Sequence, residues 1–363
     1  MKKFLLILPL AFSAFFSSCE NELELNADWE ENTIIYGLLD VNDENDVHYI
    51  KVGKAFLGDD PIAVSAQEFD SLYYNPDDIT VEVMEWEGTA LRNTYTLEAI
   101  TDIPKEEGFF TSDEQILYTF TAPLDLDMDY SIVVTNPSGE EVSAKTSMVQ
   151  EVSYDRPRRG LNAAVYVSEI EDRRYNVRFS SAKNGRRHSL KILINYFEKD
   201  SPDTPDSEAE KKQIVWDFTD TSVSRITGGE DIEYTIEPQE FFSFLANEIE
   251  ANGKYRYFSS PKRNSISGNI TAETLDFIYP SASADLSVYM DLVGPSSSLV
   301  KDKLVFNNIT NGVGLFTSRN VSKISFVPLH SKTMKEVLTN EKTRDLNFGY
   351  YEYRNDELVV VYE

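Results

Sequence analysis

Residues 79–86 read ITVEVMEW, and apolar and polar side chains alternate along the stretch except at the consecutive apolar pair Val83 and Met84. A period of two is typical of a β-strand with one buried face and one solvated face. Residues 87–90 (EGTA) follow as a turn, and residues 91–97 (LRNTYTL) complete a β-hairpin. This segment therefore predicts antiparallel β-structure, and similar short runs extend from it in both directions along the chain.

Short β-type runs separated by turn residues occupy the first 150 residues on either side of this hairpin. They cover residues 33–39, 47–52, 116–120, 129–134 and 141–146. Strands of this length at this spacing predict an antiparallel β-sandwich over residues 33–149. The run around Tyr130 is similar to the corner strand of immunoglobulin-like and fibronectin-like modules, in which a tyrosine hydroxyl holds the preceding loop.

A charged stretch containing proline and glycine interrupts the pattern at residues 155–160 (DRPRRG) and predicts a domain boundary. β-Type runs then resume. They cover residues 175–179, 190–196, 214–218, 284–292, 304–309, 314–317, 324–327 and 357–362. They predict a second antiparallel β-sandwich over residues 160–363, so the expected fold class is mainly β with two sandwich domains.

Two segments of the second domain have helical rather than strand character. Pro238 opens a run near residues 238–252, and Gly253 stands at its C-cap position. The apolar residues that share one helical face are Phe241, Phe242, Leu245 and Ile249. We expect an amphipathic helix packed on the sheet, and a shorter helix over residues 331–340.

The N-terminus has the form of a lipoprotein signal peptide over residues 1–18. Two lysines precede an apolar run at residues 4–16, which is too short to span a bilayer comfortably. Cys19 follows two serines and is the only cysteine, so it has no partner for an internal disulfide. The arrangement resembles a bacterial lipobox, which implies a diacylglycerol on the Cys19 sulfur. The alternative is an ordinary signal peptide with a cysteine nearby.

Residues 19–32 predict an acidic tether between this anchor and the folded body. Six acids and no base occur between Glu20 and Glu31. The stretch resembles the export signal of surface lipoproteins in Bacteroidetes, with Glu20, Glu22 and Glu24 at its start. A spacer that carries no signal is the alternative. The expected location is the outer membrane, lipid-anchored and facing the cell surface.

The overall charge restricts the partners of the chain. Its 62 acidic and 34 basic residues amount to a formal charge of −28. Phosphate backbones and anionic lipid surfaces repel such a chain, so nucleic-acid binding and docking through a basic patch are excluded. We expect contact with the membrane through the N-terminal lipid.

A late motif carries a family resemblance. Residues 307–316 read NNITNGVGLF, and in this order they follow the lipobox, the acidic tether, the hairpin and the Tyr130 strand. The chain thereby resembles Bacteroidetes outer-membrane lipoproteins grouped as "domain of unknown function 4249". The resemblance implies paired β-sandwiches at the outer membrane and a TonB-dependent receptor as partner, and it transfers no catalytic residue. Gly312 and Gly314 are expected to form a tight turn rather than a binding loop.

The sequence contains no constellation typical of an enzyme. Its three histidines, His48, His188 and His330, fall in no metal-binding spacing, and neither a Gly-x-Ser-x-Gly elbow nor a nucleotide loop occurs. We therefore predict a non-catalytic protein without catalytic residues, resident metal or cofactor.

Two acidic loops are candidate cation sites. Residues 40–46 (DVNDEND) carry oxygen ligands densely, but lack the glycine and the glutamate of an EF-hand loop. Asp125, Asp127 and Asp129 alternate and form a second candidate. Bound calcium in the first loop is a hypothesis beside the simpler one of a solvated turn.

One modification and one aromatic surface complete the candidate sites. Residues 70–72 (DSL) resemble the Bacteroidetes O-glycosylation acceptor, with Ser71 as the modified residue; a plain turn is the alternative. Several aromatic residues are available for stacking on sugars, although core positions are the simpler expectation. They are Trp29, Trp86, Trp216 and many of the 20 tyrosines.

Three functions compete. The first is a non-catalytic accessory lipoprotein associated with a TonB-dependent uptake receptor. The second is a glycan-binding or adhesive surface module of the β-sandwich type. The third is a hydrolase with an unrecognised carboxylate pair, since carboxylates are plentiful in the chain.

Overall fold

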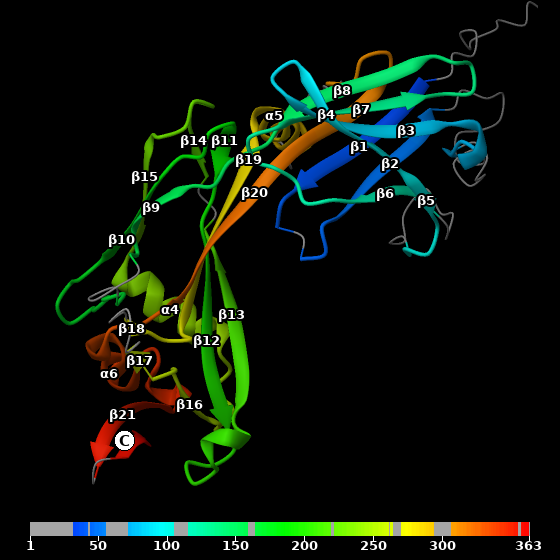
Figure 1. Ribbon diagram of the computed structural model, residues 1–363. Helices are drawn as coiled ribbons and strands as arrows, with labels where there is room; N and C mark the ends of the chain where they lie inside the picture. The colour runs from blue at the N-terminus through cyan, green and yellow to red at the C-terminus, as the bar shows by residue number, and fades with distance from the viewer. Residues whose placement is uncertain are drawn as a thin grey trace, which may run out of the picture.

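The computed structural model describes residues 32–42, 44–55, 72–104, 115–158, 164–218, 221–260, 262–263, 270–293, 306–354 and 357–362. The protein is mainly β, with 49% of the described residues in strands and 15% in helices. Figure 1 shows a bent molecule of two lobes, the first formed mainly by the blue and cyan strands and the second by the green to red ones.

Two sheets form the N-terminal lobe. One has the order β4-β3-β7-β8 and consists of Ala90–Thr96, Thr80–Glu87, Asp129–Thr135 and Glu141–Ser147. The other belongs to a large sheet and contains β1 (Asn32–Asp40), β2 (Val47–Ala55), β6 (Leu117–Thr121) and β5 (Glu98–Ile100). Apolar residues of both sheets, such as Ile35 and Ile50 from one and Val83 and Ile132 from the other, share one core. A short 3-10 helix, η2 (Pro76–Asp78), leads into β3.

The predicted hairpin is confirmed. β3 pairs antiparallel with β4, and Val81 and Val83 of β3 are buried while Glu82 between them is more exposed. The predicted tyrosine corner is confirmed as well, because the backbone N–H of Asp125 donates to the Tyr130 hydroxyl at 2.9 Å. The Tyr130 side chain is fully buried.

The C-terminal lobe continues the large sheet. Its strands are β22 (Glu357–Val361), β21 (Phe348–Arg354), β16 (Tyr255–Tyr257), β12 (Lys191–Lys199) and β19 (Leu275–Ser283), with β13 (Glu210–Asp217), β11 (Gly185–His188) and β14 (Ser222–Val223) beside this path. A three-stranded sheet has the order β15 (Asp231–Ile236), β10 (Tyr175–Ser180) and β9 (Ser153–Arg156). The smallest pairing is β17 (Lys262–Arg263) with β18 (Ile270–Thr271).

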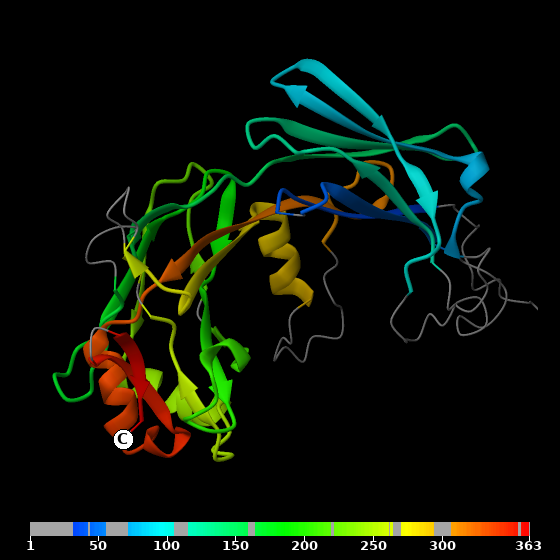
Figure 2. The ribbon, with the colours of Figure 1, turned by 60° about the horizontal axis from the view of Figure 1, so that its bottom comes forward.

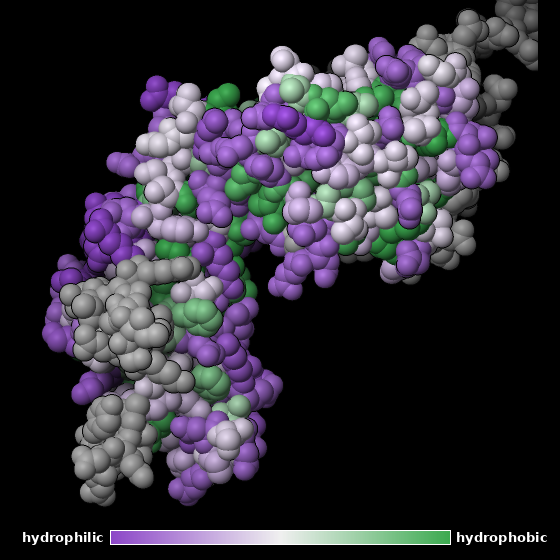
Figure 3. Space-filling view, in the orientation of Figure 1, coloured by the Kyte–Doolittle hydropathy of each residue, from purple (hydrophilic) through white to green (hydrophobic). Residues whose placement is uncertain are grey.

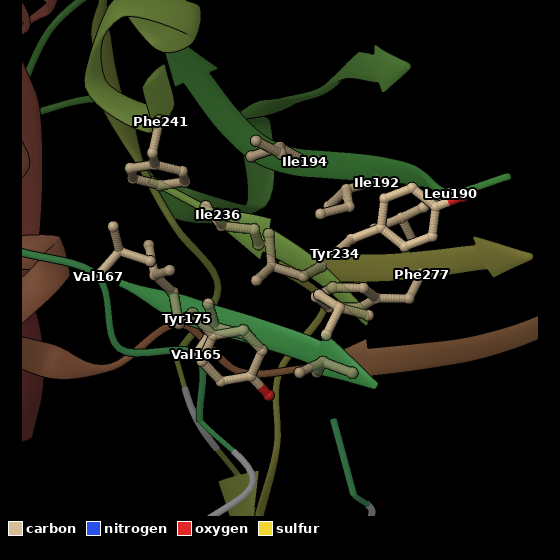
Figure 4. Packing of buried hydrophobic residues seen from close by; sticks show 14 of the residues in the cluster. Val165, Val167, Tyr175, Leu190, Ile192, Ile194, Tyr234, Ile236, Phe241 and Phe277 are labelled. Atoms are coloured by element: carbon tan, nitrogen blue, oxygen red, sulfur yellow. The ribbon is translucent and has the colours of Figure 1, made fainter. Parts of the chain in front are cut away.

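Helices close the core of this lobe. α4 (Pro238–Glu248) buries Phe241, Phe242 and Leu245, and α6 (Ser331–Thr339) buries Met334 and Val337. Figure 4 shows Phe241 pointing toward Ile194, Ile236 and other apolar side chains from the facing strands. This lobe also contains two 3-10 turns, η3 (Asp206–Glu208) and η4 (Arg344–Leu346).

One strand belongs to both lobes. β20 (Val313–Val327) pairs in parallel with β1 through residues 313–319 and antiparallel with β19 through residues 319–327. Arg319 is the point of change, since it lies opposite Asp40 on one side and Ala282 on the other. Late residues such as Ile309 and Phe316 therefore pack in the N-terminal core. The predicted domain ranges remain a prediction, to which the structure adds this shared strand.

The structure corrects several local predictions. Residues 284–292 were expected as a strand but form a helix, α5 (Ala284–Val293), because the Ser283 hydroxyl caps it by accepting from the N–H of Leu286 at 3.2 Å. The runs at 314–317 and 324–327 belong to one long strand rather than two. Residues 306–309 form no strand, and 304–305 lie outside the described residues. The helix expected to residue 252 ends at Glu248, with Ile249 as its C-cap.

Candidate binding groove

Several predicted site residues lie outside the described part of the chain. They are Cys19, Glu20, Glu22, Glu24, Trp29, Asp43 and Ser71. Lipidation, the export signal and O-glycosylation therefore stay predictions. Each helix that the structure describes is too short or too polar to cross a bilayer.

The histidines occupy three separate places in the fold. The ring Nε2 of His48 lies 2.9 Å from the carbonyl oxygen of Ala122 in the N-terminal lobe. His330 stands at the N-cap of α6, where its Nδ1 accepts from the N–H of Lys332 at 3.2 Å. Both rings thus make local contacts with backbone groups, and the structure does not bring them together.

His188 is enclosed between two serines. Its Nδ1 lies 2.8 Å from the Ser281 hydroxyl, and its Nε2 lies 2.9 Å from the Ser224 hydroxyl. The residue has no exposed surface, and burial lowers its pKa to about 4 although Glu230 acts in the opposite direction. Since Ser281 is the cross-strand partner of His188, this serine–histidine contact is an internal polar link between β11 and β19.

Several carboxylates of the two acidic loops accept hydrogen bonds from donors within the protein. Asp40 accepts from Asn42 and from Arg319, while Asp125 accepts from the N–H of Asp127. Asp129 accepts from Ser147 and forms an ion pair with Lys145. Among the described residues, no group of three or more His, Cys, Asp or Glu side chains is arranged to hold a metal ion.

The aromatic residues divide into packed and exposed groups. Trp216 stacks between Phe218 and Phe244, with ring centroids 4.9 Å away on each side, and Trp86 donates its indole N–H to Ser131 at 2.8 Å. Tyr36 and Tyr49 are 44% and 43% exposed. They share one face of the large sheet, because Tyr36 lies opposite Lys51, two residues from Tyr49.

Side chains of the late motif, residues 307–316, form hydrogen bonds with backbone groups of the same motif. Asn308 accepts from the N–H of Phe316 and donates to its carbonyl oxygen, at 3.0 and 2.8 Å. Asn307 accepts from the N–H of Gly314 at 3.0 Å. A Cβ on Gly314, whose φ is +129°, would stand 2.0 Å from the Ile35 carbonyl oxygen. The expected tight turn with close backbone approach is confirmed.

An open groove of about 740 Å³ lies beside α5, on strands of the C-terminal lobe and on the part of β20 that follows its change of partner at Arg319. Its floor is the sheet face formed by Ile278 and Pro280 of β19 and Val321 of β20. α5 borders it with Leu286 and Met290. Figure 2 shows α5 on the inner side of the bend between the lobes, and Figure 3 shows hydrophobic surface where they meet.

Basic side chains surround the apolar floor of the groove. Arg187, Lys191 and Arg319 line it, against Asp217 as the one acidic lining residue. Lys191 pairs with Asp217 at 2.7 Å, and Arg187 forms an ion pair with Asp291 of α5. Arg319 pairs with Asp40 at 2.6 Å, so each of the three basic lining residues has a carboxylate partner.

Sequence reasoning did not identify the groove. One signal was available, because residues 277–280 (FIYP) are apolar at four consecutive positions of a strand whose neighbours alternate. Phe277 and Tyr279 enter the core, whereas Ile278 and Pro280 line the groove. A strand that is apolar on both faces indicates that both faces are covered or bind something.

Comparison with models of known protein families found no match, and comparison with curated proteins found none either.

Proposed function

We propose that this chain is a lipid-anchored protein of an outer membrane that faces the cell surface and consists of two β-sandwich domains. It acts as a non-catalytic accessory component of a TonB-dependent uptake receptor, with Cys19 as its lipid-attachment residue. The acidic tether carries the body away from an anionic membrane surface.

The observation that carries this proposal is the preformed inner face between the lobes. β20 is hydrogen-bonded to β1 in one lobe and to β19 in the other, so the angle between the lobes depends on one continuous strand. The face holds an apolar groove with basic side chains around it. A preformed surface binds partners at low entropic cost, because little has to be ordered on association.

The test is co-purification from membranes. An affinity-tagged full chain is expressed in its host, and proteins are recovered from solubilised outer membranes. A receptor-type β-barrel should co-purify with the wild type, and Cys19→Ala should abolish both palmitate labelling and outer-membrane recovery. Recovery of the wild type without any barrel would refute the accessory role.

Exposed tyrosines favour glycan binding as a second candidate. Tyr36 and Tyr49 lie on one sheet face, and burial together with the neighbouring Tyr289 of α5 raises the pKa of Tyr36. Flat aromatic surfaces of this kind stack on sugar rings. A glycan array should show binding that Tyr36→Ala and Tyr49→Ala remove, and a blank array would exclude this function. The hydrolase hypothesis receives no support from Asp40 and Asp129 in the acidic loops. Their carboxylates accept hydrogen bonds from Arg319 and Ser147.

A further inference from the structure

We propose that the groove beside α5 binds a small amphiphilic anion, with its apolar body on the sheet face and its acidic group on Arg319. The inference rests on the proposed binding role of the inner face and adds the chemical class of ligand. It does not depend on which receptor stands beside the protein.

The size and floor of the groove fit the apolar body. Its volume of about 740 Å³ lies within the range of about 300 to 1,000 Å³ that is typical of small-molecule sites. Ile278, Pro280 and Val321 present a continuous apolar floor, because Pro280 and Val321 are cross-strand partners. Met290 on the bordering helix is 45% exposed, so a ligand would cover apolar surface that now faces water.

The three basic groups beside the floor are each paired with a carboxylate, so an anion would be bound by the donors that these pairs leave unused. Arg187 donates from Nε to the Ser287 hydroxyl at 3.2 Å and forms an ion pair with Asp291, and Lys191 is paired with Asp217.

Arg319 is also ion-paired, with Asp40, but it leaves two guanidinium nitrogens without an acceptor in the described part of the chain. Its Nε donates to Asp40 at 2.6 Å, and neither of its Nη atoms has a partner among the described residues. The side chain is 49% exposed. A guanidinium held at Nε presents its two Nη groups in a fixed orientation, which matches the two oxygens of a carboxylate or sulfonate.

The surrounding acids limit the ligand to one small anionic group. Asp40 and Asp217 stand beside the basic residues, and the chain as a whole carries −28. A polyanion would be repelled by this field, whereas a single acidic group exchanges water for two charge-assisted hydrogen bonds. A neutral apolar compound would fill the floor but gain nothing from Arg319.

Two probes that share one apolar body test the proposal. 2-Naphthoate carries the acidic group, and 2-naphthamide replaces it with a neutral amide. Both are titrated calorimetrically into the full chain in nanodiscs, with empty nanodiscs as the blank. We expect the naphthoate to bind at least about tenfold more tightly. Arg319→Gln should remove this preference and leave naphthamide binding unchanged.

A matched pair of variants on α5 locates the site. Met290 lines the groove and Val288 does not, although the two are 45% and 46% exposed on the same helix. Met290→Glu should abolish naphthoate binding, and Val288→Glu should leave it intact. Equal affinities for the two probes, or equal effects of the two variants, would overturn the inference. If a receptor barrel still co-purifies in that case, the accessory role stands and only the ligand assignment fails.

Discussion

The two cores of this protein are completed by different kinds of contact. In the N-terminal lobe, the late motif approaches β1 so closely that Gly314 has no room for a Cβ beside the Ile35 carbonyl oxygen. Asn308 pairs with both backbone groups of Phe316, and the Tyr130 hydroxyl holds the N–H of Asp125. The contacts that hold this core thus include uncharged groups that satisfy or closely approach the backbone.

In the C-terminal lobe, buried ionisable groups close the core. Arg256 is 1% exposed and pairs with Glu198 at 2.7 Å. Its guanidinium also donates to the carbonyl oxygens of Leu346 and Glu250, which joins β12, the segment after α4 and η4. His188 links two further strands as a buried neutral ring.

This difference indicates which changes destabilise each lobe. The backbone contacts of the N-terminal lobe are lost when a side chain is added or a single hydroxyl is removed, and this loss does not depend on pH. A buried ionisable group fails when its partner is removed or its protonation changes. Four measurements test the distinction, from the largest expected effect to the smallest.

Arg256→Met should have the largest effect. Glu198, whose side chain is 12% exposed, would keep its charge without a partner, and the free energy of unfolding should fall by about 4 kcal/mol. Chemical denaturation measures it. Lys211→Met is the control, because the Lys211–Glu273 pair is about half exposed on both sides and should contribute below about 1 kcal/mol. Similar losses of unfolding free energy in the two variants would show that the buried Arg256–Glu198 pair matters no more for stability than the exposed Lys211–Glu273 pair.

Gly314→Ala should cost about 3 kcal/mol, because the new Cβ would force β20 away from β1. Gly139→Ala is its control, since Gly139 has a φ of +81° with no atom near the added Cβ and should cost about 1 kcal/mol. Thermal unfolding followed by circular dichroism compares them. If Gly139→Ala lowered the melting temperature more than Gly314→Ala, the close approach at Gly314 would not be an important constraint on the stability of the lobe.

His188 should make stability depend on pH. Its pKa is lowered from 6.5 in the unfolded chain to about 4 in the fold, so the unfolded chain binds more protons between these values. Stability is therefore lost as the pH falls through this window. The advantage of the wild type over His188→Gln should shrink by about 2 kcal/mol between pH 7 and pH 5. A difference in unfolding free energy that stays constant over this range would contradict the buried neutral ring.

Tyr130→Phe should have the smallest effect. It removes the acceptor for the N–H of Asp125 and should cost about 1 kcal/mol at any pH. Tyr154→Phe should be close to neutral, because the Tyr154 hydroxyl donates over 3.4 Å to Lys323 at the surface. The ratio of the two melting-temperature shifts is the readout, and a larger shift for Tyr154→Phe would exclude the corner as a lock.

Much of the N-terminal fold was predictable from local pattern. Alternation at Val81 and Val83, the loop held by Tyr130 and the tight turn at Gly312 and Gly314 are all confirmed. The groove was not predictable in the same way. Ile278 and Arg319 are distant in sequence and line one groove only because β19 and β20 pair, and α5 was wrongly predicted as a strand.

The sequence by itself determined the mainly β class, the hairpin, the corner and the glycine turn, because each depends on residues within a few positions of one another. It also carries the predictions for Cys19 and the acidic tether, since targeting signals are linear. Tertiary structure alone decided that β20 serves both lobes, that Arg319 pairs with Asp40 across 279 positions, and that Arg256 is buried. Strand pairing and burial depend on contacts between segments far apart in the chain, and no local periodicity specifies which segments those are.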